Sequence, residues 1–237
     1  MLEVSNISKS YPRSSAKALD GVTFSSPGKE ILGLTGPNGA GKTTLLKILA
    51  GVLPPDAGAF KMGGVRVGEL KAEDGSRSAR SLAALAEAKP RSFYYRLSAR
   101  QNLEFFGALY GLSGEETTER VKPLADMLRV SEADHKKRFE TLSEGAMQKF
   151  SLIRALMRDF AVLLLDEPAR SLDMACASAL LAHIKDLAAA RGKTVIYASH
   201  SPRELAAVSD RTLVLKNGRL VAEIPGTELK AAWSYEF

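Results

Sequence analysis

The amino-acid sequence predicts an α/β fold: a parallel-sheet core with an N-terminal antiparallel β subdomain and a helical subdomain. Three patterns support this prediction. Apolar and polar residues alternate near the start of the chain, helical periodicity prevails from Ser98 to about Arg158, and short apolar runs alternate with helical segments after that. Strands that alternate with helices predict a parallel sheet.

The first third of the chain predicts several strands and one helix. Leu2–Ser8 and Ala18–Ser26 alternate apolar and polar residues, as half-buried antiparallel strands do. Glu30–Thr35 is an apolar strand, followed by a loop and by a helix over Lys42–Ala50. A hairpin is expected over Ala59–Val67, where two glycines form the turn.

The later elements follow the same reasoning. Apolar runs of this length are too short for an ordinary helix, so Ala161–Leu165 and Thr194–Ala198 are predicted as strands buried on both faces. Between them, Met174–Arg191 is predicted as a helix. The chain is expected to close with a hairpin at an Asn217-Gly218 turn. The other expected strands are Leu82–Ala86, Arg211–Leu215 and Arg219–Ile224.

All of these elements are expected to belong to one domain. At 237 residues the chain is long enough for a single well-packed domain with a subdomain, or for at most two small domains. Residues 1–86 and 159–237 form the predicted core, and residues 90–158 form the predicted helical subdomain. The sequence contains no internal repeat and no interdomain linker.

Composition excludes several classes. With 45% hydrophobic and 25% charged residues, neither a disordered nor a fibrous chain is indicated. The longest apolar stretches are far shorter than the roughly 20 residues that a membrane-spanning helix needs. Cys176 is the single cysteine, so no intrachain disulfide can form. The net charge of +6 comes from scattered residues and indicates a solvated basic surface, with nucleic acid or anionic lipid as the alternatives.

A phosphate-binding motif follows the third predicted strand. The segment Gly36–Thr43, GPNGAGKT, matches G-x-x-x-x-G-K-[ST] and lies between a predicted strand and a predicted helix. Its glycines let backbone N–H groups turn toward phosphate oxygens. Lys42 is expected to reach the β- and γ-phosphates, and Thr43 to offer its hydroxyl to Mg²⁺. The alternative is a flexible turn that contains glycines by chance. The residues expected to contact ATP here are Gly36, Pro37, Asn38, Gly39, Ala40, Gly41, Lys42, Thr43 and Thr44.

Two adjacent carboxylates end the apolar run in AVLLLDEP. Asp166 and Glu167 are expected at the carboxyl end of a buried strand, where open α/β sheets bind ligands. Asp166 can hold Mg²⁺ through water, and Glu167 can orient or deprotonate the water that attacks the γ-phosphate. A solvated acidic pair at a strand end is the alternative. Together with the phosphate loop, the pair predicts a P-loop NTPase.

A third motif narrows the class of P-loop protein. LSEGAMQ, Leu142–Gln148, resembles the LSGGQ signature of the nucleotide-binding domain of ABC transporters in the form LSxGxxQ. The resemblance covers the chain from about Val4 to Ile224. In that family the signature contacts the γ-phosphate of ATP on the opposite protomer, which implies that role for Ser143 and Gly145. Taken alone, Ser143 reads equally well as a helix N-cap.

The resemblance implies three further contacts. Tyr11 matches the aromatic residue that stacks on adenine, and His200 matches the switch histidine at the γ-phosphate, so that the implied catalytic residues are Lys42, Glu167 and His200. Asp173, the last residue of Ser-Leu-Asp, matches the D-loop that touches the partner protomer. The alternatives are a loop tyrosine, an incidental histidine and an N-cap for the next helix.

Two positions depart from the family pattern. The Q-loop glutamine is expected between Leu85 and Arg91 but is absent, and an ungapped comparison puts Lys89 there with Glu87 close by. Because an ammonium cannot coordinate Mg²⁺, either Glu87 substitutes or coupling to the membrane subunit uses other contacts. Glu144 replaces a signature glycine, and an acid near triphosphate is expected to repel it modestly unless the side chain points outward.

One segment suggests a class of transporter. RSFYYRLSARQNLEFF resembles the start of the helical subdomain in ABC-2 exporters, which often carry related sequence motifs. Phe93, Tyr94 and Tyr95 are expected either in the groove that receives the coupling helix of a membrane subunit or in the core of the subdomain.

The resemblance therefore implies an ATPase motor subunit. Two copies, or this chain and a paralogue, would hold two ATP molecules with Mg²⁺, beneath separate membrane permease subunits at the cytoplasmic face of the membrane. The expected task is export of a lipid, glycan or drug, and no nucleic-acid partner is expected. The alternatives are an ABC ATPase that acts as a switch on nucleic acid or ribosomes, and a small-molecule P-loop kinase, which would leave LSEGAMQ and His200 without a role.

Overall fold

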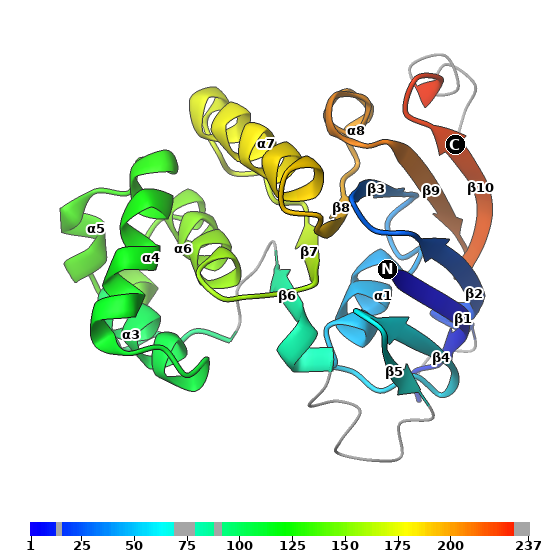
Figure 1. Ribbon diagram of the computed structural model, residues 1–237, viewed down its shortest axis with the longest axis horizontal. Coiled ribbons are helices and arrows are strands. Elements are labelled where there is room, and N and C mark those ends of the chain that lie inside the picture. The colour runs from blue at the N-terminus through cyan, green and yellow to red at the C-terminus, as the bar shows by residue number, and fades with distance from the viewer. Residues whose placement is uncertain (13–15, 69–78, 88–91, 230–237) are drawn as a thin grey trace. The chain divides into compact units, whose positions relative to one another are not determined.

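The computed structural model describes residues 1–12, 16–68, 79–87 and 92–229 (Figure 1). The chain forms two compact units. The first unit comprises Met1–Leu85, Phe160–Glu167 and Ile184–Phe237, and the second comprises Ala86–Asp159 and Pro168–His183. Residues 168–183, which the sequence analysis assigned to the core, group with the helical unit.

An antiparallel sheet occupies the N-terminal part of the first unit. Its strands follow the order β2-β1-β4-β5, and every neighbouring pair is antiparallel. The apolar residues of one face are buried: Val4 of the central strand pairs with Phe24 on one side and with Phe60 on the other. The alternation in the sequence thus predicted the buried face. The strands are β1 (Leu2–Lys9), β2 (Leu19–Ser26), β4 (Ala57–Met62) and β5 (Val65–Gly68).

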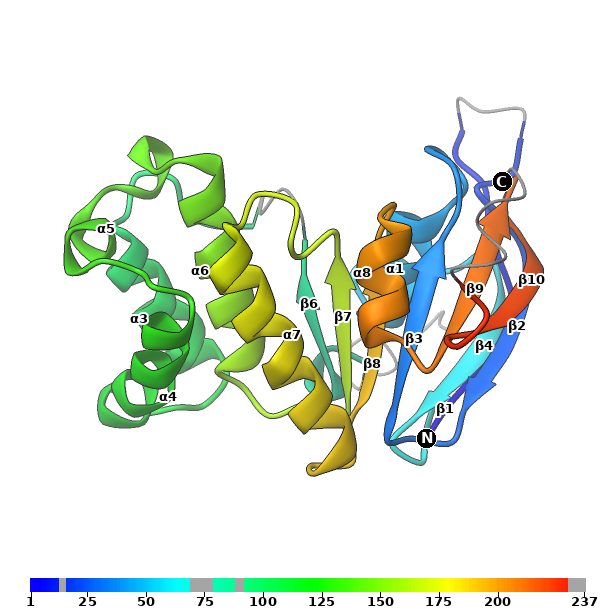
Figure 2. The same cartoon turned by 90° about the horizontal axis from the view of Figure 1, so that it is seen from above.

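The six-stranded sheet of the first unit has the order β10-β9-β3-β8-β7-β6. β9, β3, β8 and β7 run parallel, and β10 pairs antiparallel with β9 (Figure 2). Every residue of β7 and β8 is buried, as their unbroken apolar character predicts. The strands are β3 (Glu30–Thr35), β6 (Ala83–Ala86), β7 (Val162–Asp166), β8 (Thr194–Ala198), β9 (Arg211–Lys216) and β10 (Arg219–Pro225).

Helices lie against β3 on two sides. α1 (Lys42–Leu49) shares one apolar core with the antiparallel sheet and with Leu32 and Leu34 of β3. A Cβ placed on the intervening Gly33 would lie 3.1 Å from Leu205 of α8 (Pro202–Val208), because alternate residues of a strand point to opposite faces. α8 was not predicted, although Ser, Pro and Glu at its start form a recognisable helix signal.

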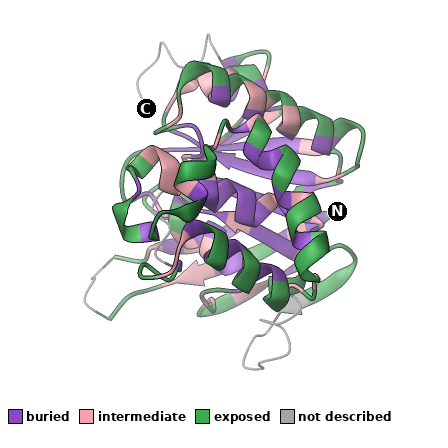
Figure 3. Cartoon of the chain, turned by 90° about the vertical axis from the view of Figure 1, so that its left-hand side faces the viewer, coloured by how far each residue is buried: buried purple, intermediate pink, exposed green. Residues whose placement is uncertain are grey.

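The second unit contains helices that begin at serine caps. The side chains of Ser98, Ser113, Ser131 and Ser143 each accept a backbone N–H of the following first turn. Figure 3 shows buried and exposed stretches along these helices, as amphipathic helices require. The helices are α3 (Ala99–Leu109), α4 (Gly114–Met127), α5 (Glu132–Lys136), the short 3₁₀ helix η1 (Phe139–Thr141) and α6 (Glu144–Leu156). A further helix, α7 (Met174–Ala189), begins in this unit and ends in the first.

Several boundaries differ from the prediction by one or two residues. β7 starts and ends one residue later than predicted, because Asp166 still pairs with Ala198 of β8. α7 ends at Ala189 instead of Arg191. Across the described residues, none of the helices has both the length and the apolar character that crossing a bilayer demands.

Candidate active site

The predicted phosphate loop connects β3 to α1. Gly36 and Gly41 both adopt positive φ angles, of 142° and 108°, which side chains rarely allow. A Cβ at Gly36 would lie 1.9 Å from the carbonyl oxygen of Leu215. Gly41 precedes α1, and no side chain among the described residues caps this helix. The first turn of α1 therefore presents its backbone N–H groups without a side-chain acceptor, as an anion site requires.

Lys42 lies inside the loop. Its buried ammonium donates to the carbonyl oxygens of Gly36 at 2.7 Å and Pro37 at 3.2 Å, and Nζ lies 3.3 Å from Nε2 of His200. Burial lowers the pKa of Lys42 from its ordinary value, and the charges of Glu167 and Asp166 oppose this change. The cation is thus surrounded by acceptors and acids in the place where phosphate oxygens are expected.

Two oxygen-bearing side chains meet between α1 and β7. The hydroxyl of Thr43 donates to Oδ2 of Asp166 at 2.7 Å. Asp166 is buried at the carboxyl end of β7, and Thr43 is exposed in the first turn of α1. A hydroxyl and a carboxylate at one point suit Mg²⁺, which prefers oxygen ligands. Both side chains that the sequence predicted as metal ligands lie together here.

Glu167 follows Asp166 in an unusual backbone conformation. Its φ is 50°, and its N–H donates to the carbonyl oxygen of Ala198 at 2.9 Å. Its buried Oε1 has no hydrogen-bond partner among the described residues, although it lies 3.5 Å from Nε2 of His200. Burial raises the pKa of Glu167, as do the charges of Asp166 and Glu204 to a smaller extent. A carboxylate of raised pKa is a stronger proton acceptor.

The side chain of His200 lies close to those of Lys42 and Glu167. His200 follows β8 by two residues, and its side chain is half exposed. The backbone N–H of His200 lowers the pKa of the Glu167 carboxylate and partly offsets the effect of burial. One ring nitrogen, Nε2, thus contacts both predicted catalytic neighbours.

Tyr11, which follows β1, lies beside the first turn of α1. Its hydroxyl is 3.3 Å from Oγ1 of Thr44, and its ring is exposed. Asn38 and Gly39 are exposed, whereas Ala40 is buried. The tyrosine therefore lies beside the phosphate loop with its ring accessible, as an adenine-stacking residue would.

The signature residues lie in the second unit. Ser143 is exposed and caps α6 by accepting the N–H of Ala146 at 3.2 Å. A Cβ at Gly145 would lie 2.7 Å from the carbonyl oxygen of Ser171, so the first turn of α6 lies directly against the D-loop backbone. The buried amide of Gln148 reaches the carbonyl oxygen of Pro168 at 3.4 Å.

Asp173 also serves as a helix cap in this unit. Its carboxylate accepts the N–H of Cys176 at 2.9 Å and lies 3.6 Å from the ammonium of Lys149. The bonds from Cys176, with a smaller contribution from Lys149, lower the pKa of Asp173 to about 2. Ser143 and Asp173 both make the capping contacts that the sequence analysis gave as their alternatives, and their expected contacts with a partner protomer stay predictions.

The aromatic residues of the SFYYRL segment divide between core and surface. Phe93 is buried and stacks on Phe139 with ring centroids 4.2 Å apart. Tyr94 and Tyr95 are exposed, and Tyr94 contacts the exposed ring of Phe105. One ring of the segment therefore fills the core and two lie on the surface, and the expected contact of those two with a membrane subunit stays a prediction.

The position of the missing Q-loop glutamine is only partly described. Glu87 is half-buried, and its carbonyl oxygen accepts the hydroxyl of Ser151 at 3.3 Å. Lys89 lies outside the described residues.

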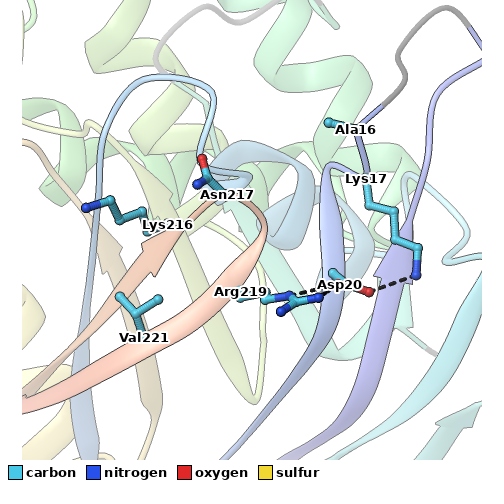
Figure 4. A pocket seen from close by; sticks show the side chains of 7 residues that line it. All are labelled: Ala16, Lys17, Asp20, Lys216, Asn217, Arg219 and Val221. Carbon is cyan, nitrogen blue, oxygen red and sulfur yellow. Dashed lines mark hydrogen bonds and ion pairs between the residues drawn. The ribbon is translucent and has the colours of Figure 1, made fainter.

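A separate hollow lies in the first unit between β2 and the β9–β10 turn (Figure 4). Its volume is about 540 Å³. The carboxylate of Asp20 pairs with two of its cations, Lys17 at 2.8 Å and Arg219 at 2.6 Å. The lining residues are Ala16, Lys17, Asp20, Lys216, Asn217, Arg219 and Val221, and they include none of the predicted site residues.

Known proteins resemble this chain over nearly its whole length. Residues 19–170 match the ABC transporter family model. The chain is 34% identical to the Nod factor export ATP-binding protein I of Paraburkholderia xenovorans over 94% of this chain and 70% of the relative. It is 31% identical to the linearmycin resistance ATP-binding protein LnrL of Bacillus subtilis, over 97% of this chain and 70% of the relative. The glucose import ATP-binding protein GlcV of Saccharolobus solfataricus is 33% identical, over 92% and 61%.

Solved structures share the fold. The dimeric, post-hydrolysis ATP-binding cassette MJ0796 bound to ADP and Pi superposes with a TM-score of 0.86 at 24% identity, covering 95% of this chain and 98% of that one. An ATP-binding subunit of an ABC transporter superposes with a TM-score of 0.82 at 28% identity, covering 99% and 93%. With the phosphate loop, the paired acids and the family match together, the chain belongs to the ABC transporter family as an ATP-binding subunit, and it is an ATPase.

Proposed function

We propose that two copies of this chain, or this chain and a paralogue, hold two ATP molecules between the phosphate loop of one protomer and the Ser143 end of α6 in the other. Closure, hydrolysis and reopening then drive a separate membrane permease. One observation carries the proposal: Lys42, Asp166, Glu167 and His200 converge at the carboxyl ends of β3, β7 and β8.

The residues of this site divide the work of hydrolysis. Lys42 and the uncapped first turn of α1 bind the β- and γ-phosphates. Glu167 orients the attacking water and accepts its proton, a task that its raised pKa favours. His200 contacts both Glu167 and Lys42, and it therefore lies where it can hold the γ-phosphate against the water.

Thr43 and Asp166 fit a magnesium ion. Their oxygens meet at 2.7 Å, and both are the hard donors that Mg²⁺ prefers. When bound, Mg²⁺ would neutralise charge on the phosphate oxygens. Ser143 and Asp173 would complete the site from the partner protomer. The dimeric state described for MJ0796 supports this assignment by analogy of fold.

The transport task is inferred from one sequence segment of the second unit and from the exposed rings that it carries. Relatives are named for export, for resistance and for import, so their names leave the direction open. The sequence motifs SFYYRL and RQNLEFF favour an ABC-2 exporter of a lipid, glycan or drug. The exposed rings of Tyr94, Tyr95 and Phe105 offer an apolar surface for a permease helix, which would hold the chain at the cytoplasmic face of the membrane.

The test of the chemistry is Glu167→Gln. ATP should still bind, because the phosphate loop is unchanged, while turnover should fall about 10²-fold or more, since the amide cannot accept the proton. Glu223→Gln, on strand β10, is the matched control and should leave turnover unchanged. An equal rate in the Glu167 variant would exclude the assigned role.

The test of the transport task is copurification from the native host. A polytopic membrane subunit that remains bound after detergent extraction would support the proposal. Association with ribosomes or DNA, and none with membranes, would favour an ABC ATPase that acts as a switch on nucleic acid or ribosomes.

A further inference from the structure

Glu204 lies in the first turn of α8, four residues after His200. Its Oε2 accepts two hydrogen bonds, from the hydroxyl of Ser199 at 2.9 Å and from that of Tyr197 at 3.1 Å. Tyr197 is fully buried in β8, and Ser199 is 1% exposed. None of the motifs in the sequence includes Glu204. One carboxylate thus holds the strand that leads to the switch histidine and the residue directly before it.

Ser199 is held by its backbone as well as by its side chain. Its N–H donates to the carbonyl oxygen of Leu34 at 3.1 Å, and its own carbonyl oxygen accepts the hydroxyl of Thr35 at the same distance. Its Oγ also accepts the N–H of Ser201 at 3.0 Å. The hydroxyl of Ser199 therefore connects the residues on both sides of His200, and it donates a hydrogen bond to Glu204.

The side chain of Glu204 does not make the capping bond that its position in α8 predicts. It occupies the third position of α8, where a glutamate usually bonds the backbone N–H of the capping residue. Glu116 does this in α4, where it accepts the N–H of Ser113 at 2.7 Å. In α8 the corresponding N–H, of Ser201, goes to Ser199 instead, and the Glu204 carboxylate extends past the cap.

We propose that Glu204 is a positioning residue for ATP hydrolysis: through Ser199 it fixes the ring of His200 where it contacts Glu167 and Lys42. Nε2 of the His200 ring lies 3.3 Å from Nζ of Lys42 and 3.5 Å from Oε1 of Glu167. A displacement of the backbone at Ser199 and Ser201 would move both contacts together. The inference rests on the proposed roles of Glu167 and His200.

The primary test compares Glu204→Ala with Glu116→Ala. The first variant should lower single-turnover ATP hydrolysis by about 10-fold or more, because small misplacements of catalytic groups are costly. Binding of a fluorescent ATP analogue should stay within about twofold, since the phosphate loop is untouched. Glu116→Ala removes the same kind of helix-start glutamate and should leave turnover unchanged. Equal turnover in wild type and Glu204→Ala would overturn the proposal.

Glu204→Gln covers the case in which the alanine variant does not fold. Its amide oxygen can still accept both hydroxyls, so its turnover should lie between those of wild type and Glu204→Ala. A glutamine variant that is folded, and as slow as an empty-vector control, would contradict positioning by these hydrogen bonds. Ser199→Ala should slow turnover as well, whereas Ser209→Ala, which removes a buried hydroxyl at the other end of α8, should not.

A double-mutant cycle with His200→Ala separates positioning from a general structural role. If Glu204 acts through His200, adding Glu204→Ala to His200→Ala should cause no further loss of turnover. Losses that multiply would show that Glu204 acts by another route. Failure of this inference can be told apart from failure of the proposed function. If turnover is low in Glu167→Gln but normal in Glu204→Ala, this inference alone is rejected. If turnover is normal in Glu167→Gln, the assigned site is rejected.

Discussion

Helices α1 and α6 both begin where the sequence predicts a phosphate contact, but their first turns differ. α1 starts after Gly41, and none of the described side chains caps it. α6 starts after Ser143, whose hydroxyl oxygen accepts the N–H of Ala146. The first turn of α1 also carries the buried cation Lys42, whereas that of α6 carries the exposed acid Glu144.

We infer from this difference that the starts of α1 and α6 contribute unequally to phosphate binding. Uncapped N–H groups beside a cation bind an anion without help, whereas a start that is already capped, with an acid in its first turn, attracts an anion weakly. We therefore interpret α1 as the primary ATP site and α6 as a contact that matters once a second copy brings its own triphosphate.

The largest effect is expected at Lys42. Lys42→Ala should lower ATP turnover by about 10²- to 10³-fold, because it removes the cation from a site that stabilises developing negative charge. Steady-state phosphate release measures this effect. Lys47→Ala, at the other end of the same helix, should retain turnover near that of wild type. A similar loss in both variants would show that α1 needs lysines for folding only.

A smaller effect is expected at Ser143. Ser143→Ala should lower turnover about 10-fold and also lower the free energy of unfolding by about 1 kcal/mol, because the cap of α6 is lost. Ser113→Ala removes the corresponding cap of α4 and should cost similar stability with no change in turnover. Equal turnover in the two variants would mean that Ser143 is a cap and nothing more.

Removal of the acid beside Ser143 should act in the opposite direction. Glu144→Gln should raise turnover by about twofold at low salt, because repulsion between exposed charges is worth less than about 1 kcal/mol. The increase should vanish at high salt, where such charges are screened. Glu115→Gln, also in the first turn of a helix, serves as the control. A decrease in the Glu144 variant would indicate that this acid contributes to the second contact.

The smallest effect is expected from the ionisation of Asp173. Because its pKa is lowered to about 2 in the folded chain, the charged form stabilises the fold above the ordinary value near 3.8, and this stabilisation is lost as pH falls toward 2. Asp173→Asn should therefore melt at a slightly lower temperature than wild type at pH 7. The gap in melting temperature should narrow below pH 4. A gap that is constant with pH would contradict this account.

Local patterns predicted most of the fold and of the primary site. The strands Glu30–Thr35 and Thr194–Ala198 have the bounds predicted from their apolar runs, and Gly36–Gly41 forms the expected loop between strand and helix. These features depend on backbone conformation and on near neighbours in the chain. α8 was missed because its pattern is short, even though Ser201 and Glu204 mark its start.

Side-chain partners across the fold were harder to predict. The sequence could not tell which of three consecutive aromatic residues fills the core, and only Phe93 does so, because its ring stacks on Phe139 from a distant segment. Likewise, Glu204 looks like an ordinary helix-start glutamate until the tertiary structure brings Ser199 and Tyr197 within its reach.

The amino-acid sequence by itself determined the family, the phosphate loop and the two acids, because glycine spacing, a lysine and a charged strand end carry their chemistry locally. Only the tertiary structure decided that Thr43 meets Asp166, that His200 lies between Lys42 and Glu167, and that Glu204 holds the loop before that histidine. The physical reason is the strand order. It brings β3, β7 and β8 side by side, and so joins residues that lie more than a hundred positions apart in the chain.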